Sequence, residues 1–144
     1  MKEYKVEVTD YSTRWFNLED MLHREDGPAI EFANGHKEYY INDKLHREDG
    51  PAVEYANGDK AYYINGIHHR EDGPAVEFTS GYKAYYIIGR YHREDGPAVE
   101  FVGGNKAYFI NGEELTEQEF NNRNKSCENK IVEIEGVKYK LTKV

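Results

Sequence analysis

The segment HREDGPA occurs four times in this 144-residue chain, starting at His23, His46, His69 and His92, with a constant spacing of 23 residues. Each occurrence belongs to a longer copy, and the copies span residues 22–44, 45–67, 68–90 and 91–113. Twelve of the 23 positions carry the same residue in all four copies. Self-similarity at a fixed period predicts one structural unit stacked repeatedly along an axis.

Within the second copy, apolar and polar residues alternate with the period of two that is typical of β-strands. We expect residues 52–55 and 60–64 to form a hairpin, with Asn57-Gly58 as a type I′ turn. Tyr55 would then lie opposite Lys60, and Val53 opposite Tyr62. This pairing predicts a packed face with Val53, Tyr55, Tyr62 and Ile64, and a half-polar face with Ala52, Glu54, Ala61 and Tyr63.

The HREDG segment is expected to form the connection between successive hairpins. It follows a second turn signal, Asn65-Gly66, and leads through Gly73-Pro74 into the next strand. Proline fixes its own φ and glycine can adopt a positive φ, so Gly73-Pro74 predicts a bend or bulge. Asp72 is expected to accept hydrogen bonds from turn amides, and Arg70 to pair with Glu71 or with an acid of a neighbouring copy.

The copies resemble MORN repeats in unit length and in their aromatic, Asn-Gly and glycine positions. The matching segments are Tyr62-Tyr63-Ile64-Asn65-Gly66, Gly73 and Val76-Glu77-Phe78, with Ala56-Asn57-Gly58-Asp59-Lys60 ahead of them. The resemblance covers about residues 22–113 and departs where the usual His-Gly-x-Gly segment is replaced by His-Arg-Glu-Asp-Gly-Pro. It implies an elongated, twisted ribbon of hairpins that is used for binding and has no catalytic residues to carry over.

The two ends differ from the repeat and are expected to cap it. In residues 1–21, aligning Arg14 with Lys37 and Phe16 with Tyr39 predicts a degenerate hairpin with strands at 2–8 and 14–18. In residues 114–144, a capping box and a hydrophobic staple predict a helix from 117 to about 123, followed by a loop through 129 and a hairpin at 131–141. The residues concerned are Thr116 and Glu119 for the box, Leu115 and Phe120 for the staple, and Glu133 facing Lys138 in the hairpin. The expected fold is therefore mostly β: a single-layer, solenoid-like ribbon of antiparallel hairpins with a short C-terminal helix and a terminal hairpin.

Charge limits the partners that such a ribbon can take. The net charge is −8, and the four copies contribute −6 of it through sixteen acidic and ten basic residues. An acidic surface repels phosphate backbones and anionic lipids and attracts basic partners, so we expect no direct binding to nucleic acid or membrane. The sequence contains no apolar run of about 18 residues and no signal-like leader, and Cys127 is the only cysteine, which together favour a cytoplasmic location.

The histidines and acids of each copy could act as metal ligands or as an acid–base pair. A catalytic site normally needs one asymmetric constellation, whereas four near-copies form a ladder, so we expect no enzyme activity, no metal and no cofactor. His68 departs from the pattern by forming a His-His pair, and it is the one histidine for which a ligand role is weighed against that of a solvated turn residue. A metal-dependent hydrolase that uses His68, His69 and Asp72 is the least favoured alternative.

Two ladders are candidate binding residues. The aromatic ladder consists of Tyr40, Tyr63, Tyr86 and Phe109, and the acidic ladder consists of Glu31, Glu54, Glu77 and Glu100. The aromatic ladder either packs internally or forms a binding stripe beside the glutamates, and the sequence leaves both interpretations open. The copies differ mainly at their rims, where Tyr82 and His68 lie, and a variable rim suits partner-specific contacts.

The leading hypothesis is a non-catalytic, acidic protein-binding module that recognises a basic partner. By analogy of charge and size with phage-encoded inhibitors of host defence, that partner would be a nucleic-acid-handling enzyme. The alternative is a protein that binds or sequesters a small ligand, with its tyrosines stacking a base or sugar. Association of two ribbons through an exposed face is left open.

Overall fold

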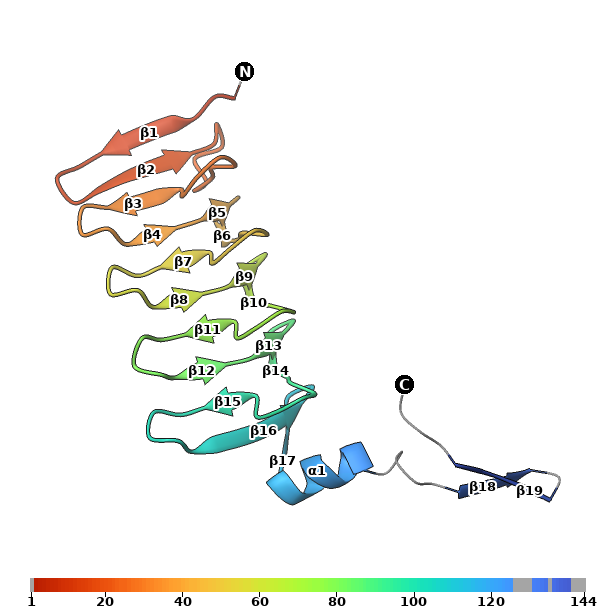
Figure 1. Ribbon diagram of the computed structural model, residues 1–144. Helices are drawn as coiled ribbons and strands as arrows, with labels where there is room; N and C mark the ends of the chain where they lie inside the picture. The colour runs from red at the N-terminus through yellow and green to blue at the C-terminus, as the bar shows by residue number, and fades with distance from the viewer. Residues whose placement is uncertain (1, 126–130, 135, 141–144) are drawn as a thin grey trace.

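The protein forms an open ribbon of antiparallel β-hairpins stacked along one axis (Figure 1). The computed structural model describes residues 2–125, 131–134 and 136–140. Its largest sheet has eleven strands in the order β1-β2-β3-β4-β7-β8-β11-β12-β15-β16-β17. The expectation of a mostly β ribbon with one short C-terminal helix is confirmed.

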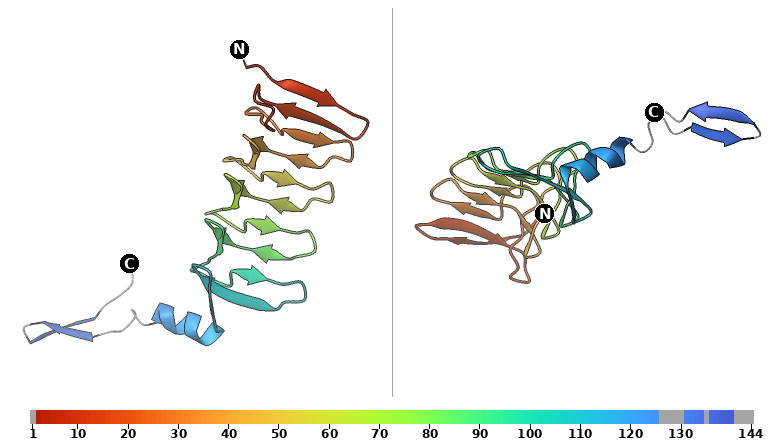
Figure 2. Two further views of the ribbon diagram at one scale, coloured as in Figure 1. Left: turned by 180° about the vertical axis from the view of Figure 1, so that it is seen from behind. Right: turned by 90° about the horizontal axis from the view of Figure 1, so that it is seen from below.

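Each repeat contributes two hairpins instead of the single one expected. The strands of the main sheet are β1 (Lys5–Val8), β2 (Ser12–Phe16), β3 (Ile30–Phe32), β4 (Lys37–Glu38), β7 (Val53–Glu54), β8 (Lys60–Ala61), β11 (Val76–Glu77), β12 (Lys83–Ala84), β15 (Val99–Glu100), β16 (Lys106–Ile110) and β17 (Glu113–Leu115). Three small hairpins pair β5 (Tyr40–Ile41) with β6 (Lys44–Leu45), β9 (Tyr63–Ile64) with β10 (Ile67–His68), and β13 (Tyr86–Ile87) with β14 (Arg90–Tyr91). They form a second row along one side of the main sheet (Figure 2).

The hairpin tip in the main sheet differs from the predicted type I′ turn. The amide of Tyr55 donates to the carbonyl of Asp59 at 3.0 Å, and the amide of Gly58 donates to the carbonyl of Tyr55 at 2.9 Å. Only the glycine of the Asn57-Gly58 pair has a positive φ, of 91°. These features define a three-residue loop in which a type I turn is followed by a left-handed glycine.

This turn changes the predicted pairing by one residue. Val53 pairs with Ala61, and Glu54 pairs with Lys60. Because directly opposed residues share a face, the predicted division into a packed and a half-polar face is wrong. Val53 and Ala61 are instead buried together, at 4% relative exposure each, on what we call the apolar face.

The type I′ turn lies at Asn65-Gly66, where the φ values are 51° and 80°. It joins β9 to β10, with Ile64 opposite Ile67. The chain leaves the main sheet at Tyr62, whose amide still donates to Ala75 while its carbonyl accepts from His69. The predicted continuous strand over 60–64 is therefore divided at Tyr62.

The apolar face of the main sheet carries the core. From β7 to β16 a valine lies beside an alanine in each pair of strands, as in Val76, which pairs with both Ala61 and Ala84. These side chains and the alanines of the HREDGPA segments form most of the buried set: Ala29, Ile30, Ala52, Val53, Ala61, Ala75, Val76, Ala84, Ala98 and Val99. A narrow core of small residues holds successive repeats at the spacing of adjacent strands.

The N-terminal unit joins the main sheet with a register different from the predicted one. Thr13 of β2 pairs with Glu31, as Lys37 of β4 pairs with Glu54. Thr13 therefore takes the place of Lys37, and the predicted alignment of Arg14 with Lys37 and of Phe16 with Tyr39 is wrong by one residue. The connection from β2 to the first HREDGPA segment is one residue longer than the equivalent connections in the repeats.

At the other end, α1 (Glu117–Lys125) follows β17. The predicted capping box is confirmed, because Glu119 accepts hydrogen bonds from the Thr116 amide and hydroxyl while the Glu119 amide donates to the Thr116 hydroxyl. Phe120 of this helix is buried against Tyr108, with ring centroids 4.9 Å apart. The terminal hairpin of β18 (Ile131–Ile134) and β19 (Val137–Lys140) has the predicted pairing of Glu133 with Lys138, whereas residues 126–130, Glu135 and Leu141 lie outside the described residues.

Candidate functional site

The arginine of each HREDGPA segment organises its loop. The guanidinium carbon of Arg47 lies 4.1 Å from the centroid of the Tyr39 ring in the preceding repeat. Its Nε donates to Asp49 at 2.8 Å, and its Nη1 donates to the Pro51 carbonyl at 3.3 Å and to Glu54 at 2.7 Å. The cation–π contact and the bonds to charged groups together fix the loop to both repeats.

The other three arginines repeat this arrangement. Arg24, Arg70 and Arg93 lie 4.0–4.1 Å from the ring centroids of Trp15, Tyr62 and Tyr85. The predicted partners of Arg70, namely Glu71 or an acid of a neighbouring copy, are wrong, since it pairs with Asp72 at 2.8 Å and Glu77 at 3.9 Å in its own repeat. The Arg70 guanidinium also holds the pKa of Asp72 below its usual value.

The glycine of the segment is required by this arginine and not by its own backbone angle. A Cβ at Gly73 would lie 2.9 Å from Cζ of Arg70, whereas the φ of Gly73 lies outside the left-handed region. Gly73 therefore does not adopt the positive φ that glycine allows at this position. The same approach, at 2.9–3.1 Å, occurs at Gly27, Gly50 and Gly96.

The histidines of the segments hold the type I′ turns. Nδ1 of His46 accepts a hydrogen bond from the amide of Asn65 at 3.1 Å, and Nδ1 of His69 accepts one from the amide of Ile88 at 3.1 Å. An accepting Nδ1 requires the neutral ring with its proton on Nε2. That Nε2 lies 3.7 Å from Glu48 in one repeat and 3.7 Å from Glu71 in the next.

Exposed carboxylates form an acid rim along the loops, made of Glu25, Asp26, Glu48, Asp49, Glu71, Asp72, Glu94 and Asp95. The side chains of Glu48, Glu71 and Glu94 are 81–85% exposed. Three equivalent open grooves, of about 800, 780 and 660 Å³, lie between successive loops. Rim acids line each groove beside a tyrosine and an isoleucine, which are Tyr62 and Ile64 in the second groove.

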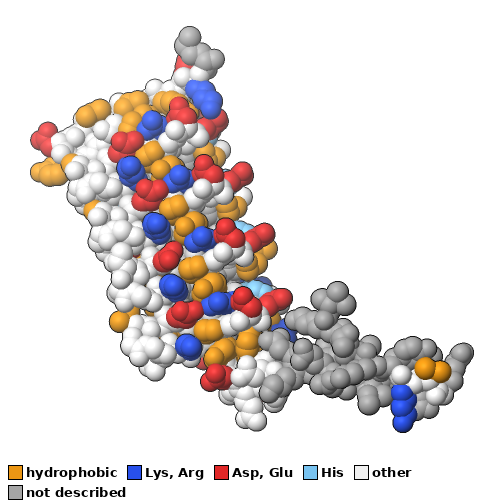
Figure 3. Space-filling model, in the orientation of Figure 1, with side chains coloured by type: hydrophobic (Ala, Val, Ile, Leu, Met, Phe, Trp, Pro, Cys, Tyr) orange, Lys and Arg blue, Asp and Glu red, His pale blue; other side chains and the backbone are white. Residues whose placement is uncertain are grey.

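The acid rim lies beside a ladder of alternating charges on the main sheet. Glu54 pairs with Lys37 on one side and with Lys60 on the other, and Glu77 pairs with Lys60 and Lys83. Acidic and basic side chains accordingly alternate along this surface (Figure 3). We call it the charged face, and its glutamates are largely balanced by neighbouring lysines and arginines.

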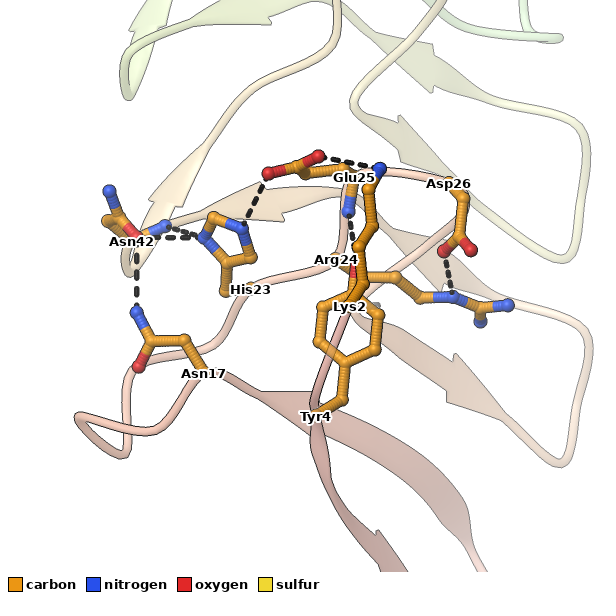
Figure 4. A network of polar contacts seen from close by, with 8 residues as sticks. All are labelled: Lys2, Tyr4, Asn17, His23, Arg24, Glu25, Asp26 and Asn42. Carbon is orange, nitrogen blue, oxygen red and sulfur yellow. Dashed lines mark hydrogen bonds and ion pairs between the residues drawn. The ribbon is translucent and has the colours of Figure 1, made fainter.

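The N-terminal segment covers the first loop of the rim (Figure 4). Nζ of Lys2 lies 2.7 Å from Glu25, and the hydroxyl of Tyr4 accepts a hydrogen bond from the Glu25 amide at 3.3 Å. The ion pair lowers the pKa of Glu25 and raises that of Lys2. The side chain of Glu25 is 53% exposed, compared with 85% for Glu48. The chain thus places one of its own lysines on the first rim glutamate.

The predicted aromatic and acidic ladders do not form one stripe. Glu31, Glu54, Glu77 and Glu100 lie in the main sheet, in register with Lys37, Lys60, Lys83 and Lys106. Tyr40, Tyr63 and Tyr86 lie in the small hairpins, and Phe109 lies in the part of β16 that pairs with β17. The expectation that they share a face is wrong because it depended on the incorrect register.

From Tyr63 onward, the aromatic ladder instead forms a stack with His68 and Tyr91, the first residues of the third and fourth copies. Ring centroids are 4.0 Å apart between Tyr63 and His68, 4.9 Å between His68 and Tyr86, 4.4 Å between Tyr86 and Tyr91, and 5.0 Å between Tyr91 and Phe109. Burial lowers the pKa of His68 and raises that of Tyr86. The sequence analysis did not include the first residue of each copy, such as His68 or Tyr91, in the ladder. That position carries different residue types in different copies, so it shows no aromatic pattern.

His68 lies inside this stack, and its buried Nδ1 has no hydrogen-bond partner among the described residues. His69 faces the next type I′ turn, and Asp72 faces Arg70. In the described part of the chain, no three His, Cys, Asp or Glu side chains are grouped as a metal site requires. The side chains named for the hydrolase alternative therefore have separate local environments.

Two further features occur at the hairpin tips. Tyr82 packs between Phe78 and Phe101, with centroid distances of 5.4 and 6.0 Å, and burial raises its pKa. In the first repeat, Glu38 accepts from Nε2 of His36 at 2.8 Å and from the Tyr40 hydroxyl at 3.1 Å. Burial and this carboxylate raise the pKa of Tyr40 to about 12. The sequence analysis missed this cluster. The signal that could have indicated it is the glutamate at position 38, where the other three copies carry alanine.

No protein-family model matches the sequence, and no curated protein is similar to it at a significant level. None of the helices within residues 2–125, 131–134 and 136–140 has the length and apolar character needed to cross a bilayer.

Proposed function

We propose that the protein is a non-catalytic binding module whose acid rim receives basic side chains of a partner protein. The observation that carries this proposal is the pair formed by Lys2 and Glu25, at 2.7 Å. It provides an intramolecular example of a lysine on a rim glutamate. Glu48, Glu71 and Glu94 occupy the equivalent places in the other repeats and are more exposed than Glu25.

The period of the rim supports an extended contact. Successive rim glutamates are separated by two strands of the main sheet, which corresponds to about 10 Å. A partner surface with basic side chains at a similar spacing would contact several rim acids at once, and multivalent contact increases affinity without requiring a tight single site. A net charge of −8 adds long-range attraction to such a surface.

The partner class that suits this chemistry is a nucleic-acid-handling enzyme, because its substrate channel is basic. The module would then act as an inhibitor that occupies the channel inside the cell. The resemblance to MORN repeats is consistent with a binding scaffold that has no catalytic residues. Direct nucleic-acid or membrane binding is not part of the proposal, since the rim would repel phosphate groups.

A titration with a nonalysine peptide at low salt tests the proposal, read by amide chemical shifts. We expect shifts at loops 46–51, 69–74 and 92–97 that disappear at high salt. The triple variant Glu48→Lys, Glu71→Lys and Glu94→Lys should lose them. Its matched control, Glu3→Lys, Asp10→Lys and Glu19→Lys, has the same net charge and exposed positions outside the rim, and should retain them. Equal loss of binding in both variants would show that net charge alone is responsible and would overturn the proposal.

The small-ligand alternative is less well supported by the aromatic geometry. Successive rings of the stack are separated by 4.0–5.0 Å, so they already contact one another. A base or sugar could enter only if two rings moved apart. A saturable thermal shift with a nucleoside, abolished by Tyr63→Ala, would favour this alternative over the acid-rim proposal.

A further inference from the structure

The first strand of the ribbon presents an open edge. β1 pairs with β2, and among the described residues it has no second strand partner. It lies at one end of the stack, whereas β17 and α1 follow the other end (Figure 1). Val6 and Val8 of this strand are 52% and 72% exposed. An exposed apolar edge strand is a template for pairing with another strand.

The hydrogen-bond pattern determines which residues of β1 face outward. The amide of Thr9 donates to the carbonyl of Ser12 at 2.9 Å, in the same register as the pairs of Lys5 with Phe16 and Glu7 with Arg14. Hydrogen-bonded and non-hydrogen-bonded pairs alternate along an antiparallel ladder. Lys5 and Glu7 therefore direct their backbone groups towards β2, and Val6 and Val8 direct theirs towards the open edge.

We propose that this edge pairs with β1 of a second copy of the chain, antiparallel and centred on Val6. Val6 then lies opposite the partner's Val6 as a hydrogen-bonded pair, and Lys5 lies opposite the partner's Glu7. Tyr4 lies opposite the partner's Val8. Val6 and Val8 bury exposed surface on one face of the joined sheet, while two pairs of opposite charge form on the other face.

Charge complementarity selects this register over its neighbours. The outward backbone groups of Val6 and Val8 must oppose outward groups of the partner, so the next allowed registers are displaced by two residues. One displacement places Glu7 opposite the partner's Glu7, and the other places Lys5 opposite the partner's Lys5. Like charges directly opposed across a strand pair are destabilising. The centred register is the one that pairs both charges favourably.

Proline at the central position tests the edge directly. Since the amide of Val6 points away from β2, Val6→Pro removes an outward donor without removing a bond between β1 and β2. By sedimentation velocity at about 10 to 500 µM, a range suited to a small interface, we expect the unaltered chain to dimerise and Val6→Pro to remain monomeric. Val6→Thr keeps the amide and the branched side chain and should still dimerise. Circular dichroism checks that all variants are folded.

Two charge variants test the register. Lys5→Glu and Glu7→Lys each place like charges opposite one another in a homodimer, so each should dimerise at least tenfold more weakly than the unaltered chain. Their equimolar mixture restores both opposite-charge pairs and should form a heterodimer, which native mass spectrometry detects when one variant is labelled with ¹⁵N. An unaltered chain that stays monomeric, a Val6→Pro variant that dimerises normally, or a mixture without heterodimer would overturn the proposal.

Discussion

The guanidinium carbon of Arg70 lies 4.0 Å from the centroid of the Tyr62 ring, and it lies 2.9 Å from the position that a Cβ on Gly73 would occupy. The arginine is thus held between an aromatic ring of the preceding repeat and the backbone of its own loop. The contact links two repeats through side chains at a point where the chain leaves the main sheet. Its equivalents at Arg24, Arg47 and Arg93 connect the remaining units in the same way.

Gly73→Ala should lower the free energy of unfolding by about 1–2 kcal/mol, because the added methyl displaces the guanidinium from Tyr62 and from its hydrogen bonds. Urea denaturation measures the change. The control is the same substitution in an Arg70→Ala background, where the space is empty and the expected loss is only about 0.5 kcal/mol or less. An equal loss in both backgrounds would contradict the assigned role of Gly73.

Ile88→Asn should raise the free energy of unfolding by about 1 kcal/mol. Ile88 has a φ of 48°, which is strained for a β-branched residue, and its side chain is 70% exposed. Asparagine stands at this turn position in the other three repeats and tolerates the left-handed conformation. The reverse exchange, Asn65→Ile, should destabilise by a similar amount in the same denaturation assay. Stabilisation by both exchanges would exclude backbone strain as the cause.

Lys60→Glu should destabilise the ribbon by about 1 kcal/mol, since Lys60 lies between Glu54 and Glu77 in the main sheet. Lys60→Ala removes the attraction without adding repulsion. Its free energy of unfolding should therefore lie between that of the unaltered chain and that of Lys60→Glu. Raising the salt concentration should reduce the difference between the alanine and glutamate variants, because these side chains are partly exposed. A salt-independent difference in thermal unfolding would indicate a packing effect instead of charge.

Replacing His68 should reduce the sensitivity of the fold to mild acid. Burial between Tyr63 and Tyr86 lowers the pKa of His68 from its usual value of 6.5, so the unfolded chain binds a proton more readily than the folded one. Stability is therefore unaffected by this group well above pH 6.5 and falls as the pH decreases through that value towards the folded pKa.

His68→Leu restores the residue type found at Leu22 and Leu45 and should remove this component of the acid destabilisation. Denaturation at pH 7.5 and pH 5 measures the difference between the variant and the unaltered chain, so the contributions of the other histidines cancel. An unchanged pH dependence would show that His68 titrates as freely in the folded state as in the unfolded one.

The features that follow from local, periodic signals were predictable. The 23-residue spacing predicts stacked hairpin units, because copies with the same pattern of residues fold in the same way and pack on their neighbours in the same way. The capping box at Thr116 and Glu119 and the pairing of Glu133 with Lys138 depend on residues close in sequence. Such interactions do not depend on parts of the chain that are distant in sequence.

The tip register was not predictable, because Asn57-Gly58 is compatible both with a type I′ turn and with a type I turn followed by a left-handed glycine. The choice changes which side chain faces the core. It separates Glu54 from Tyr63 and therefore the acidic ladder from the aromatic one. A displacement of one residue in a strand reverses every face, so a small local ambiguity determined the outcome for the predicted binding stripe.

The sequence by itself determined the repeat, its β character, the acidic charge and the capping box of the C-terminal helix, since these depend on composition and on residues near one another in the chain. Only the tertiary structure decided that Arg70 requires Gly73, that His68 lies between Tyr63 and Tyr86, and that Lys2 lies on Glu25. Stacking brings the aromatic rings of neighbouring repeats together, and the first strand brings Lys2 to the first loop. These contacts result from the packing of whole units, and a pattern of residue types does not specify them.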